Sequence, residues 1–394
     1  MSEWKKVKLG EVANYVNDKI DIKAFDTSLY ISTDSMLKDK GGIGTPESIP
    51  ESGKVTKYQH NDILVSNIRP YFKKIWFSNR EGGCSNDVLV FRANNKVDST
   101  FLYYILCDDS FFDHIMSGAN GTKMPRGNKK LIPSFEIPLP PLSIQHRIAT
   151  ILSRYDSLIE NYQKQIKLLE EAAQRFYKEW FIDLHFPGHE NTNIIDGVPE
   201  GWERKKVGDV CQTVGGGTPS TKVAEYYDDG NIKWVTPTDI TRSNCLCLFD
   251  TDKKITEEGL THSSAKMLPP ETILMTSRAS VGYFGIYDCK VCTNQGFISC
   301  IPNESSYQMY LLYNLMNRVE EIRQKAGGST YLEISKSVFR DFDIVLPNSK
   351  ILESFQEQSH KMLDCMRQIA SQLRLLTEAR DRLLPKLMSG EIEV

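Results

Sequence analysis

Several short motifs in this sequence have residue types that phosphate binding or catalysis would need. The glycine-rich run Gly215–Lys222 is similar to a phosphate-binding loop, but it lacks the second glycine directly before Lys-Ser/Thr that a P-loop requires. The two Pro-Pro pairs, at Pro140 and Pro269, each follow a leucine, whereas an amino-methyltransferase motif usually carries Asn or Asp there. No Pro-Asp pair begins a common nuclease motif. We therefore interpret the glycine run as a turn and predict no catalytic residue.

Nine cysteines raise the alternative of a metal site. Cys289–Cys292 forms one Cys-x-x-Cys knuckle, and Cys245 and Cys247 precede it. A structural zinc site needs four ligands and often uses two such knuckles. The seven histidines form no His-Glu-x-x-His cluster, and no motif indicates a Ser/His/Asp triad, although a dispersed one stays open. We expect no metal, and reduced thiols typical of a cytosolic protein.

Length and composition limit the class of protein. A chain of 394 residues suits two or three domains, and its 40% hydrophobic and 25% charged residues are ordinary for a globular protein. A net charge of −3 argues against a protein that coats DNA non-specifically, but it permits a small reading surface. No run of about 18 apolar residues is present and the N-terminus lacks a signal-peptide core, so we expect a cytoplasmic location and no membrane partner.

The sequence contains an internal repeat, and the elements of this repeat must position any functional residues. Four segments of the first half recur in the same order in the second half, and the last offset, 207, continues without a gap to the end of the chain. The matched segments are Trp4–Val12 with Trp202–Val210, Ile63–Ser66 with Ile273–Thr276, Cys84–Asn86 with Cys292–Asn294, and Phe135–Pro140 with Phe342–Pro347. Each copy shows short β-type runs, a helical segment near 99–116 or 306–324, a polar loop, a final strand and a long helix. A duplication without functional symmetry is the alternative.

The long helix that closes each copy is predicted to form a coiled coil. Apolar residues after the expected N-cap Ser143 recur at spacings of four and three for nearly five heptads. The predicted seam is Ile144, Ile148, Ile151, Leu158, Leu169 and Phe176 in the first helix, and Ile351, Phe355, Met362, Ile369, Leu376 and Leu383 in the second. Gln165 and Gln372 fall at equivalent seam positions, where they either form a buried polar layer or face solvent. Equivalent helices are expected to pair antiparallel as a spacer of roughly 57 Å for roughly 38 residues.

At this point the whole chain resembles the specificity subunits of type I restriction–modification systems. The segments that carry the resemblance are Leu139–Gln145, Gly217–Ser220, Trp234–Ile240, Thr276–Gly282, Thr293–Phe297 and Leu383–Ile392. The resemblance implies two target-recognition domains that each read half of a split target in double-stranded DNA, with the helices setting the gap. It also implies partners: two methyltransferase subunits that use S-adenosylmethionine, and motor–nuclease subunits. No cofactor is expected in this chain.

Two polar loops in each copy have the side chains that base reading and phosphate binding need. They are Ser66–Lys74 and Gly121–Lys130 in the first copy, and Thr276–Ser280 and Gly328–Lys336 in the second. The DNA-binding candidates are Asn67, Arg69, Lys73, Lys74, Lys123, Arg126, Lys129, Lys130, Thr236, Thr238, Thr276, Arg278, Ser280, Thr330, Tyr331 and Lys336. We expect Arg69 and Arg278 to contact guanines. Solvated turns without DNA contact are the alternative.

The predicted fold is α+β, with two similar mixed α/β target-recognition domains separated by two long antiparallel helices. The expected boundaries are 1–142, first recognition domain; 143–182, first helix; 183–201, linker; 202–347, second recognition domain; and 348–394, second helix and tail. The predicted function is non-catalytic recognition of a bipartite, asymmetric DNA target and recruitment of partner enzymes. A coiled-coil scaffold that never contacts DNA, or a divergent methyltransferase or nuclease, is the alternative.

Overall fold

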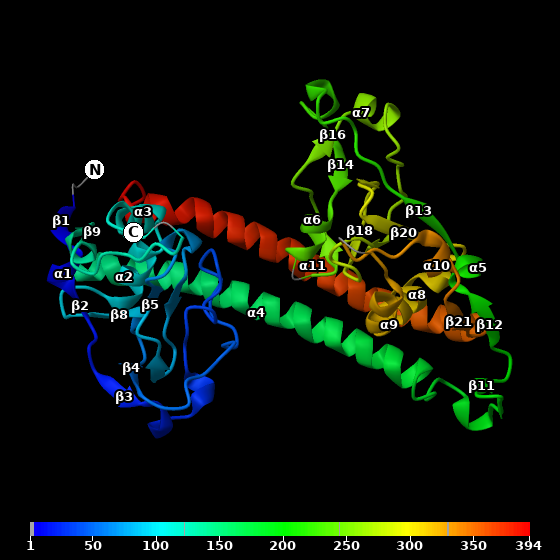
Figure 1. The fold of residues 1–394 in the computed structure, drawn as a ribbon, viewed down its shortest axis with the longest axis horizontal. Coiled ribbons are helices and arrows are strands. Elements are labelled where there is room, and N and C mark those ends of the chain that lie inside the picture. Colours follow the sequence, from blue (N-terminus) through cyan, green and yellow to red (C-terminus); the bar gives the residue numbers. More distant parts are fainter. Residues whose placement is uncertain (1–3, 122, 244, 329–330) are drawn as a thin grey trace. The chain divides into compact units, whose positions relative to one another are not determined.

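The computed structural model describes residues 4–121, 123–243, 245–328 and 331–394 (Figure 1). The chain divides into two compact units. Unit 1 comprises the residues up to Ile159 together with Leu376–Val394, and unit 2 is Glu160–Leu375. Each unit therefore combines one globular domain with a part of each long helix. The domain boundaries expected from the sequence stay predictions, since the division into units falls inside the helices and not at their ends.

The two domains begin and end in the same way, which explains why the sequence repeat is strongest at these places. In unit 1, β1 (Lys5–Lys8) pairs antiparallel with β9 (Glu136–Leu139), and in unit 2, β12 (Glu203–Lys206) pairs antiparallel with β21 (Asp343–Leu346). The short helices α1 (Leu9–Val12) and α5 (Val207–Val210) follow. Their first N–H groups donate to equivalent carbonyls, Leu9 to Phe135 and Val207 to Phe342, each at 2.8 Å. The first and last segments of each copy are thus neighbours in space.

The main sheets of the two domains share their strand order, apart from an additional strand in unit 2. The main sheet has the order β2-β8-β5-β6 in unit 1 and β13-β20-β17-β18-β15 in unit 2. A three-stranded sheet accompanies each, β3-β4-β7 and β16-β14-β19. The unit 1 strands are β2 (Ala13–Tyr15), β3 (Lys19–Asp21), β4 (Lys54–Tyr58), β5 (Ile63–Ser66), β6 (Ile75–Phe77), β7 (Gly82–Cys84) and β8 (Val88–Ala93). The unit 2 strands are β13 (Cys211–Gly215), β14 (Ile232–Val235), β15 (Cys247–Leu248), β16 (Lys254–Ile255), β17 (Ile273–Thr276), β18 (Phe284–Tyr287), β19 (Cys292–Thr293) and β20 (Phe297–Pro302).

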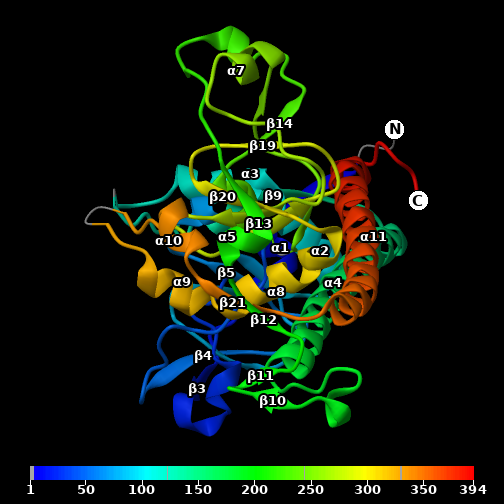
Figure 2. The same ribbon diagram turned by 90° about the vertical axis from the view of Figure 1, so that its right-hand side faces the viewer.

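Each predicted helical segment is two helices, and not one. They are α2 (Ser99–Leu106) and α3 (Asp109–Ser117) in unit 1, and α8 (Gln308–Asn317) and α9 (Val319–Lys325) in unit 2. Asp108 separates the first pair because its extended backbone and its side chain, which accepts from Ser110 N, begin a new helix. Three shorter helices complete unit 2: α6 (Pro237–Thr241), α7 (Glu257–Thr261) and α10 (Lys336–Arg340). In the second view, α7 and β14 extend away from α8 within unit 2 (Figure 2).

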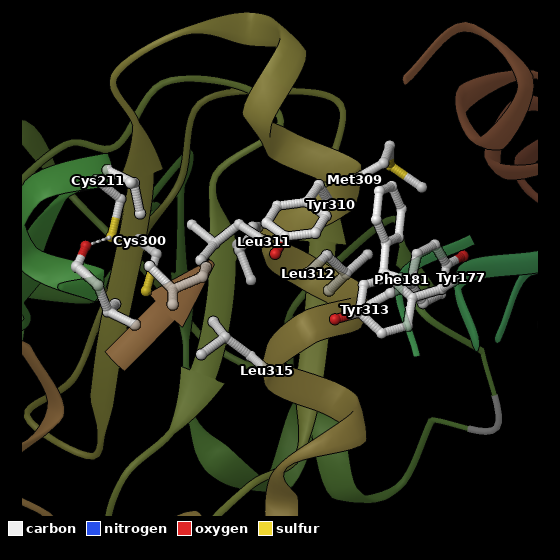
Figure 3. Close-up of a cluster of buried hydrophobic side chains, with 14 of the residues drawn as sticks. Tyr177, Phe181, Cys211, Cys300, Met309, Tyr310, Leu311, Leu312, Tyr313 and Leu315 are labelled. Carbon is white, nitrogen blue, oxygen red and sulfur yellow. Dashed lines mark hydrogen bonds between the residues drawn. The ribbon is translucent and has the colours of Figure 1, made fainter. Parts of the chain in front are cut away.

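Helix α8 lies at the centre of the unit 2 core. Residues 308–315 of this helix are all buried. Figure 3 shows Leu311 and Leu315 on the side that faces the sheet cysteines Cys211 and Cys300, and Tyr310 and Tyr313 on the side that faces Phe181 and Tyr177. The helix is therefore buried around its whole circumference, because both the sheet and the long helix pack on it.

The two long helices are α4 (Leu142–Phe181) and α11 (Ser349–Met388), each of 40 residues. In unit 1, Arg380 of α11 contacts Asp156 of α4 at 2.8 Å. In unit 2, the rings of Phe355 and Phe176 stack with centroids 5.0 Å apart. From Asp156 to Phe176 the position along α4 advances, whereas the contacted position along α11 goes back from Arg380 to Phe355. The helices therefore pair antiparallel, as the sequence predicted.

In each helix the buried row is shifted by one residue toward the C-terminus from the predicted row that begins at Ile144 in α4 and at Ile351 in α11. Ile148, Ile351 and Phe355 are buried as expected, but Leu158 is 40% exposed. The other seam candidates, Ile144, Ile151, Leu169, Phe176, Met362, Ile369, Leu376 and Leu383, are only partly buried. The fully buried row is Gln145, Leu152, Ile159, Ile166 and Ala173 in α4, and Leu352, Ser359 and Met366 at the matching positions of α11. Gln165 and Gln372 are exposed, which is the solvent-facing alternative.

The cause of this offset is that each helix packs on its globular domain as well as on the other helix. Ile148, Ala149 and Leu152 belong to the same core as Phe101 and Ile105 of α2 and Leu387 of α11. The buried arc is then wider than a two-helix seam and centred between the two partners. Heptad spacing predicts the long helix correctly, but it does not predict that the helix also packs on its own globular domain.

Buried polar groups fix each domain on its helix. In unit 1, Gln145 is 1% exposed, and its side-chain oxygen accepts from Asp98 N at 2.8 Å. In unit 2, Glu271 accepts from Arg367 of α11 at 2.6 Å and from the Gln308 side chain at 3.0 Å. Breaking one such buried charge-assisted contact costs about 1.5–3 kcal/mol. These contacts therefore hold the loops of each domain in a defined orientation on the helix segment of the same unit.

Candidate nucleic-acid interface

In unit 1 the structure brings together the two loops that the sequence selected. Ile68 and Asn120 each form a backbone bridge with Arg126. The N–H of Arg69 donates to Pro125 O at 2.8 Å, and Gly127 N donates to Asn67 O at 3.2 Å. The loops 66–74 and 120–130 thus form a single surface.

Unit 2 repeats this arrangement at the matching positions. Arg278 and Gly327 each bridge to Glu333. Ala279 N donates to Leu332 O at 2.8 Å, and Ile334 N donates to Ser277 O at 3.0 Å. Of the predicted contacts in this loop, Thr330 lies outside the described residues.

The backbone at these loops is held in conformations that L-residues seldom adopt. Arg69, Lys73 and Ala279 have φ values of 48°, 50° and 61°. Left-handed backbone at non-glycine residues costs about 1–3 kcal/mol each and concentrates at ligand-binding sites. The buried Nε of Arg69 and Oδ1 of Asn67 find no hydrogen-bond partner among the described residues.

Two predicted contacts, Asn67 and Thr276, are buried, and a third, Lys74, is partly buried and hydrogen-bonded to protein, so none of them is free to contact DNA as the loops stand. Asn67 is 5% exposed and Thr276 is 0% exposed. The Thr276 hydroxyl accepts from Tyr283 N at 2.9 Å and donates to Ser280 O, which closes the 276–283 loop. Lys74 Nζ donates to Thr33 O at 2.6 Å, and burial lowers the pKa of this lysine. These side chains hold the loops in position. Short polar residues that follow a strand can either support a loop or contact DNA bases, and the sequence alone does not distinguish the two roles.

Four predicted cationic contacts are exposed and carry no ion pair among the described residues: Lys123, Lys129, Lys130 and Lys336. Tyr331 is 60% exposed, and the partly or fully exposed Thr236, Thr238 and Ser280 lie on the surface of unit 2. Thr236 begins α6, where its N–H and hydroxyl both donate to Asp239. The exposed cations are free to approach phosphates.

Three further predicted cations, Lys73, Arg126 and Arg278, each have an acidic partner. Lys73 lies 2.7 Å from Asp109, and this lysine holds the pKa of the Asp109 carboxyl below its ordinary value. Arg126 lies 3.3 Å from Asp87 in unit 1, and Arg278 lies 3.6 Å from Glu333 in unit 2. All three pairs are partly exposed, so each contributes at most about 1 kcal/mol and can exchange its carboxylate for a phosphate or a base.

A hollow beside Arg278, here called the reading hollow, adds residues that sequence reasoning missed. It has a volume of about 260 Å³ and is lined by Pro237, Arg278, Ala279, Asn294, Gln295, Gly296 and Tyr331. Asn and Gln side chains pair bidentately with adenine, as Arg does with guanine. The repeated segment Cys292–Asn294 was the available signal for this turn, but only the fold places it beside Arg278.

The described residues contain no group of three or more His, Cys, Asp or Glu side chains placed to hold a metal ion. All nine cysteines are free thiols, and Cys84, Cys107, Cys211, Cys247, Cys292 and Cys300 are buried. No helix within the described residues is long and apolar enough to cross a membrane.

Comparison with known proteins adds independent findings. The family model of the type I restriction modification DNA specificity domain matches residues 1–171 and 199–381. The HindI specificity subunit of Haemophilus influenzae is 24% identical over 464 residues, covering 100% of both chains. The MjaIX specificity subunit of Methanocaldococcus jannaschii is 27% identical, covering 76% of this chain and 70% of that protein. The crystal structure of the type I restriction–modification S subunit from M. genitalium has a similar fold, with a TM-score of 0.65 at 17% identity over 98% of this chain and 96% of that one.

Proposed function

Because this chain belongs to the family of type I restriction–modification DNA specificity proteins, we propose that each of its two units reads one half of a bipartite DNA target. The family is the non-catalytic, sequence-recognising component of these systems, which works in a complex with other subunits and DNA. The observation that carries the proposal is the pair of bridged loops, present at matching positions in both units.

The target is asymmetric because the frames of the two domains match and their loop residues do not. The second loop of unit 1 carries Lys123, Arg126, Lys129 and Lys130, whereas its counterpart in unit 2 carries Tyr331, Glu333 and Lys336. The acidic partner also changes place: Asp87 neutralises the Arg of the second loop in unit 1, and Glu333 neutralises the Arg of the first loop in unit 2. Different donor and acceptor patterns select different base pairs.

Roles within each interface follow from exposure. Arg69 and Arg278 contact guanine edges, with Asn294 and Gln295 beside Arg278. Lys123, Lys129, Lys130 and Lys336 contact phosphates, which orient the domain on the duplex. Lys73 and Arg126 join them after leaving Asp109 and Asp87.

The partners are two methyltransferase subunits, which bind S-adenosylmethionine, and motor–nuclease subunits; the chain itself needs no cofactor. The paired helices α4 and α11 fix the number of base pairs between the two half-sites. The complex acts in the cytoplasm on double-stranded DNA. Family membership supports these assignments, and the antiparallel helix pair supports a fixed gap.

The test is co-expression of the full chain with its cognate methyltransferase, followed by genome-wide mapping of modified adenines. We expect two different half-sites at one fixed spacing. The double substitution Arg126→Ala and Lys129→Ala weakens binding through unit 1, and the slope of log K against log[salt] becomes shallower by about 2. Unchanged binding and salt dependence would contradict the unit 1 interface, and methylation without sequence preference would favour a scaffold that never reads DNA.

A further inference from the structure

A second hollow in unit 2, here called the basic hollow, includes Lys336 of the interface proposed above, but its other residues have no role in that interface. Its volume is about 370 Å³, and it opens where β13 ends. The side chains that give it chemical character are Thr213, Ser264, Lys266, Lys336 and Arg340, beside the backbone of Gly215. None of the described lining residues is acidic. We propose that this hollow binds one phosphate group.

The cationic side chains are held in place around the hollow. A Cβ atom added to Gly215 would lie 3.2 Å from Lys336 Nζ, so the ammonium group lies close to the glycine backbone of the strand. Arg340 donates from Nε to the Thr213 hydroxyl and from an Nη atom to Thr213 O at 3.3 Å. Arginine fixed in this way presents its remaining N–H groups in a defined direction, as phosphate recognition requires.

The opposite wall is fixed by close backbone packing. A Cβ atom on Gly217 would lie 2.2 Å from Ser264 Oγ, so the glycine run passes directly against the segment that carries Ser264 and Lys266. A Cβ atom on Gly216 would lie 2.1 Å from Asn294 O, and Asn294 lines the reading hollow. The glycine run therefore joins the two hollows, and a phosphate bound in one is near a base read in the other.

Unit 1 provides an internal comparison, because the same frame there carries other residues at the positions of Thr213 and Arg340. Thr213 pairs with Cys300 in the sheet, and Tyr15 pairs with Phe91 at the matching position. Tyr15 is larger than Thr213, and its hydroxyl donates to Lys129 O at 3.2 Å. The smaller threonine therefore leaves more space at this position in unit 2.

The helix that follows the second loop shows the matching exchange of charge. A Cβ atom added to Gly10 in unit 1 would lie 3.0 Å from the Cβ of Pro133, and one added to Gly208 in unit 2 would lie 3.0 Å from the Cβ of Arg340. A neutral proline thus stands where unit 2 has arginine. Asp341, the chain neighbour of Arg340, is paired with Lys206 at 3.4 Å. The arginine of the hollow is therefore specific to unit 2, whereas Lys336 has Lys129 at the matching position of unit 1.

The phosphate comes either from the DNA backbone or from a free nucleotide or inorganic phosphate, and the residues suit all of these. A backbone phosphate is favoured because Lys336 follows directly from the reading loop and Asn294 joins the two hollows. This source rests on the proposed function, whereas the phosphate chemistry does not.

The experiment compares the full wild-type chain with Lys266→Gln, Lys336→Gln and the double variant, each assembled with the cognate methyltransferase. Lys253→Gln is the control, because Lys253 is exposed in unit 2 and does not line either hollow. Dissociation constants are measured on cognate and scrambled duplexes between 0.05 and 0.3 M salt, which spans roughly the range where counterion release dominates. Inorganic phosphate is titrated into the same proteins by calorimetry.

At about 0.1 M salt, one phosphate contact contributes about eightfold to affinity, so we expect about an eightfold loss for each single variant and a salt slope shallower by about 0.9 per lysine. The loss is equal on cognate and scrambled DNA, since phosphates carry no sequence information. Binding of inorganic phosphate that each single variant abolishes also supports the hollow, with a free anion as its ligand. Unchanged DNA affinity, unchanged slope and no phosphate binding overturn the proposal. In that case a wild-type chain that still prefers its cognate duplex leaves the proposed function intact.

Discussion

Leu152 and Leu158 provide a matched test of how α4 packs in unit 1. Both leucines lie on the same helix and in the same unit. Leu152 is fully buried in the core with Ile148 and Leu387, whereas Leu158 is 40% exposed. Heptad spacing selected Leu158 for the seam and omitted Leu152. Substituting each by alanine therefore separates the periodicity from the packing.

The two substitutions should differ severalfold in their effect on stability. Leu152→Ala removes buried carbon atoms and leaves a cavity, which costs about 2–5 kcal/mol. For a unit of about 150–250 residues this lowers the Tm by about 4–20 °C. At Leu158 much of the side chain already contacts water, so we expect a loss of about 1 kcal/mol and about 2–4 °C.

The assay is differential scanning calorimetry of the full chain, because two units need not unfold in one transition. A far-ultraviolet circular dichroism spectrum equal to that of the wild type at about room temperature establishes that each variant is folded before heating. The transition that moves in Leu152→Ala belongs to unit 1, and it should move little in Leu158→Ala. An equal or larger decrease at Leu158 would refute the burial pattern and restore the heptad row.

Three further outcomes are expected. Glu333→Gln releases Arg278, so affinity for scrambled DNA rises and the salt slope steepens by about 1; a decrease in that affinity would instead make Glu333 a reading residue. Thiol titration at about pH 8 should label the exposed Cys365 and the partly exposed Cys245 and Cys289, and Cys365→Ser should remove one of these reactive thiols; buried thiols such as Cys84, whose pKa burial raises to about 12, should not react in the folded chain, and fast labelling of any of them would contradict the buried assignments. Burial also raises the pKa of Glu170, so its charge destabilises unit 2 above that pKa and ceases to do so as the pH falls towards 4.5. Glu170→Gln, which keeps an acceptor for Leu246 N, should therefore raise the Tm by a few degrees near pH 8 and hardly at all near pH 4.5; equal effects at both would contradict this.

The candidate interface was predictable in part, since the structure joins the loops that the sequence selected but buries some of their side chains. Loops 66–74 and 120–130 contain polar and basic residues between strand-like runs, and the structure bridges them. Burial decides which of these residues can reach a ligand, and Asn67 and Thr276 are inside. Asn294 and Gln295 were not predicted as contacts, because what makes them candidates is their position beside Arg278, which belongs to a different loop.

The sequence by itself determined the duplication, the long helices and the absence of a recognisable catalytic motif, because these depend on local spacing and residue type. Only the tertiary structure decided which face of α4 and α11 is buried, because two partners compete for each helix: its domain and the other helix. The tertiary structure also decided that Thr213 and Arg340 open a cationic hollow where Tyr15 and Pro133 stand in the other copy. Such differences involve residues more than a hundred positions apart, which no local pattern connects.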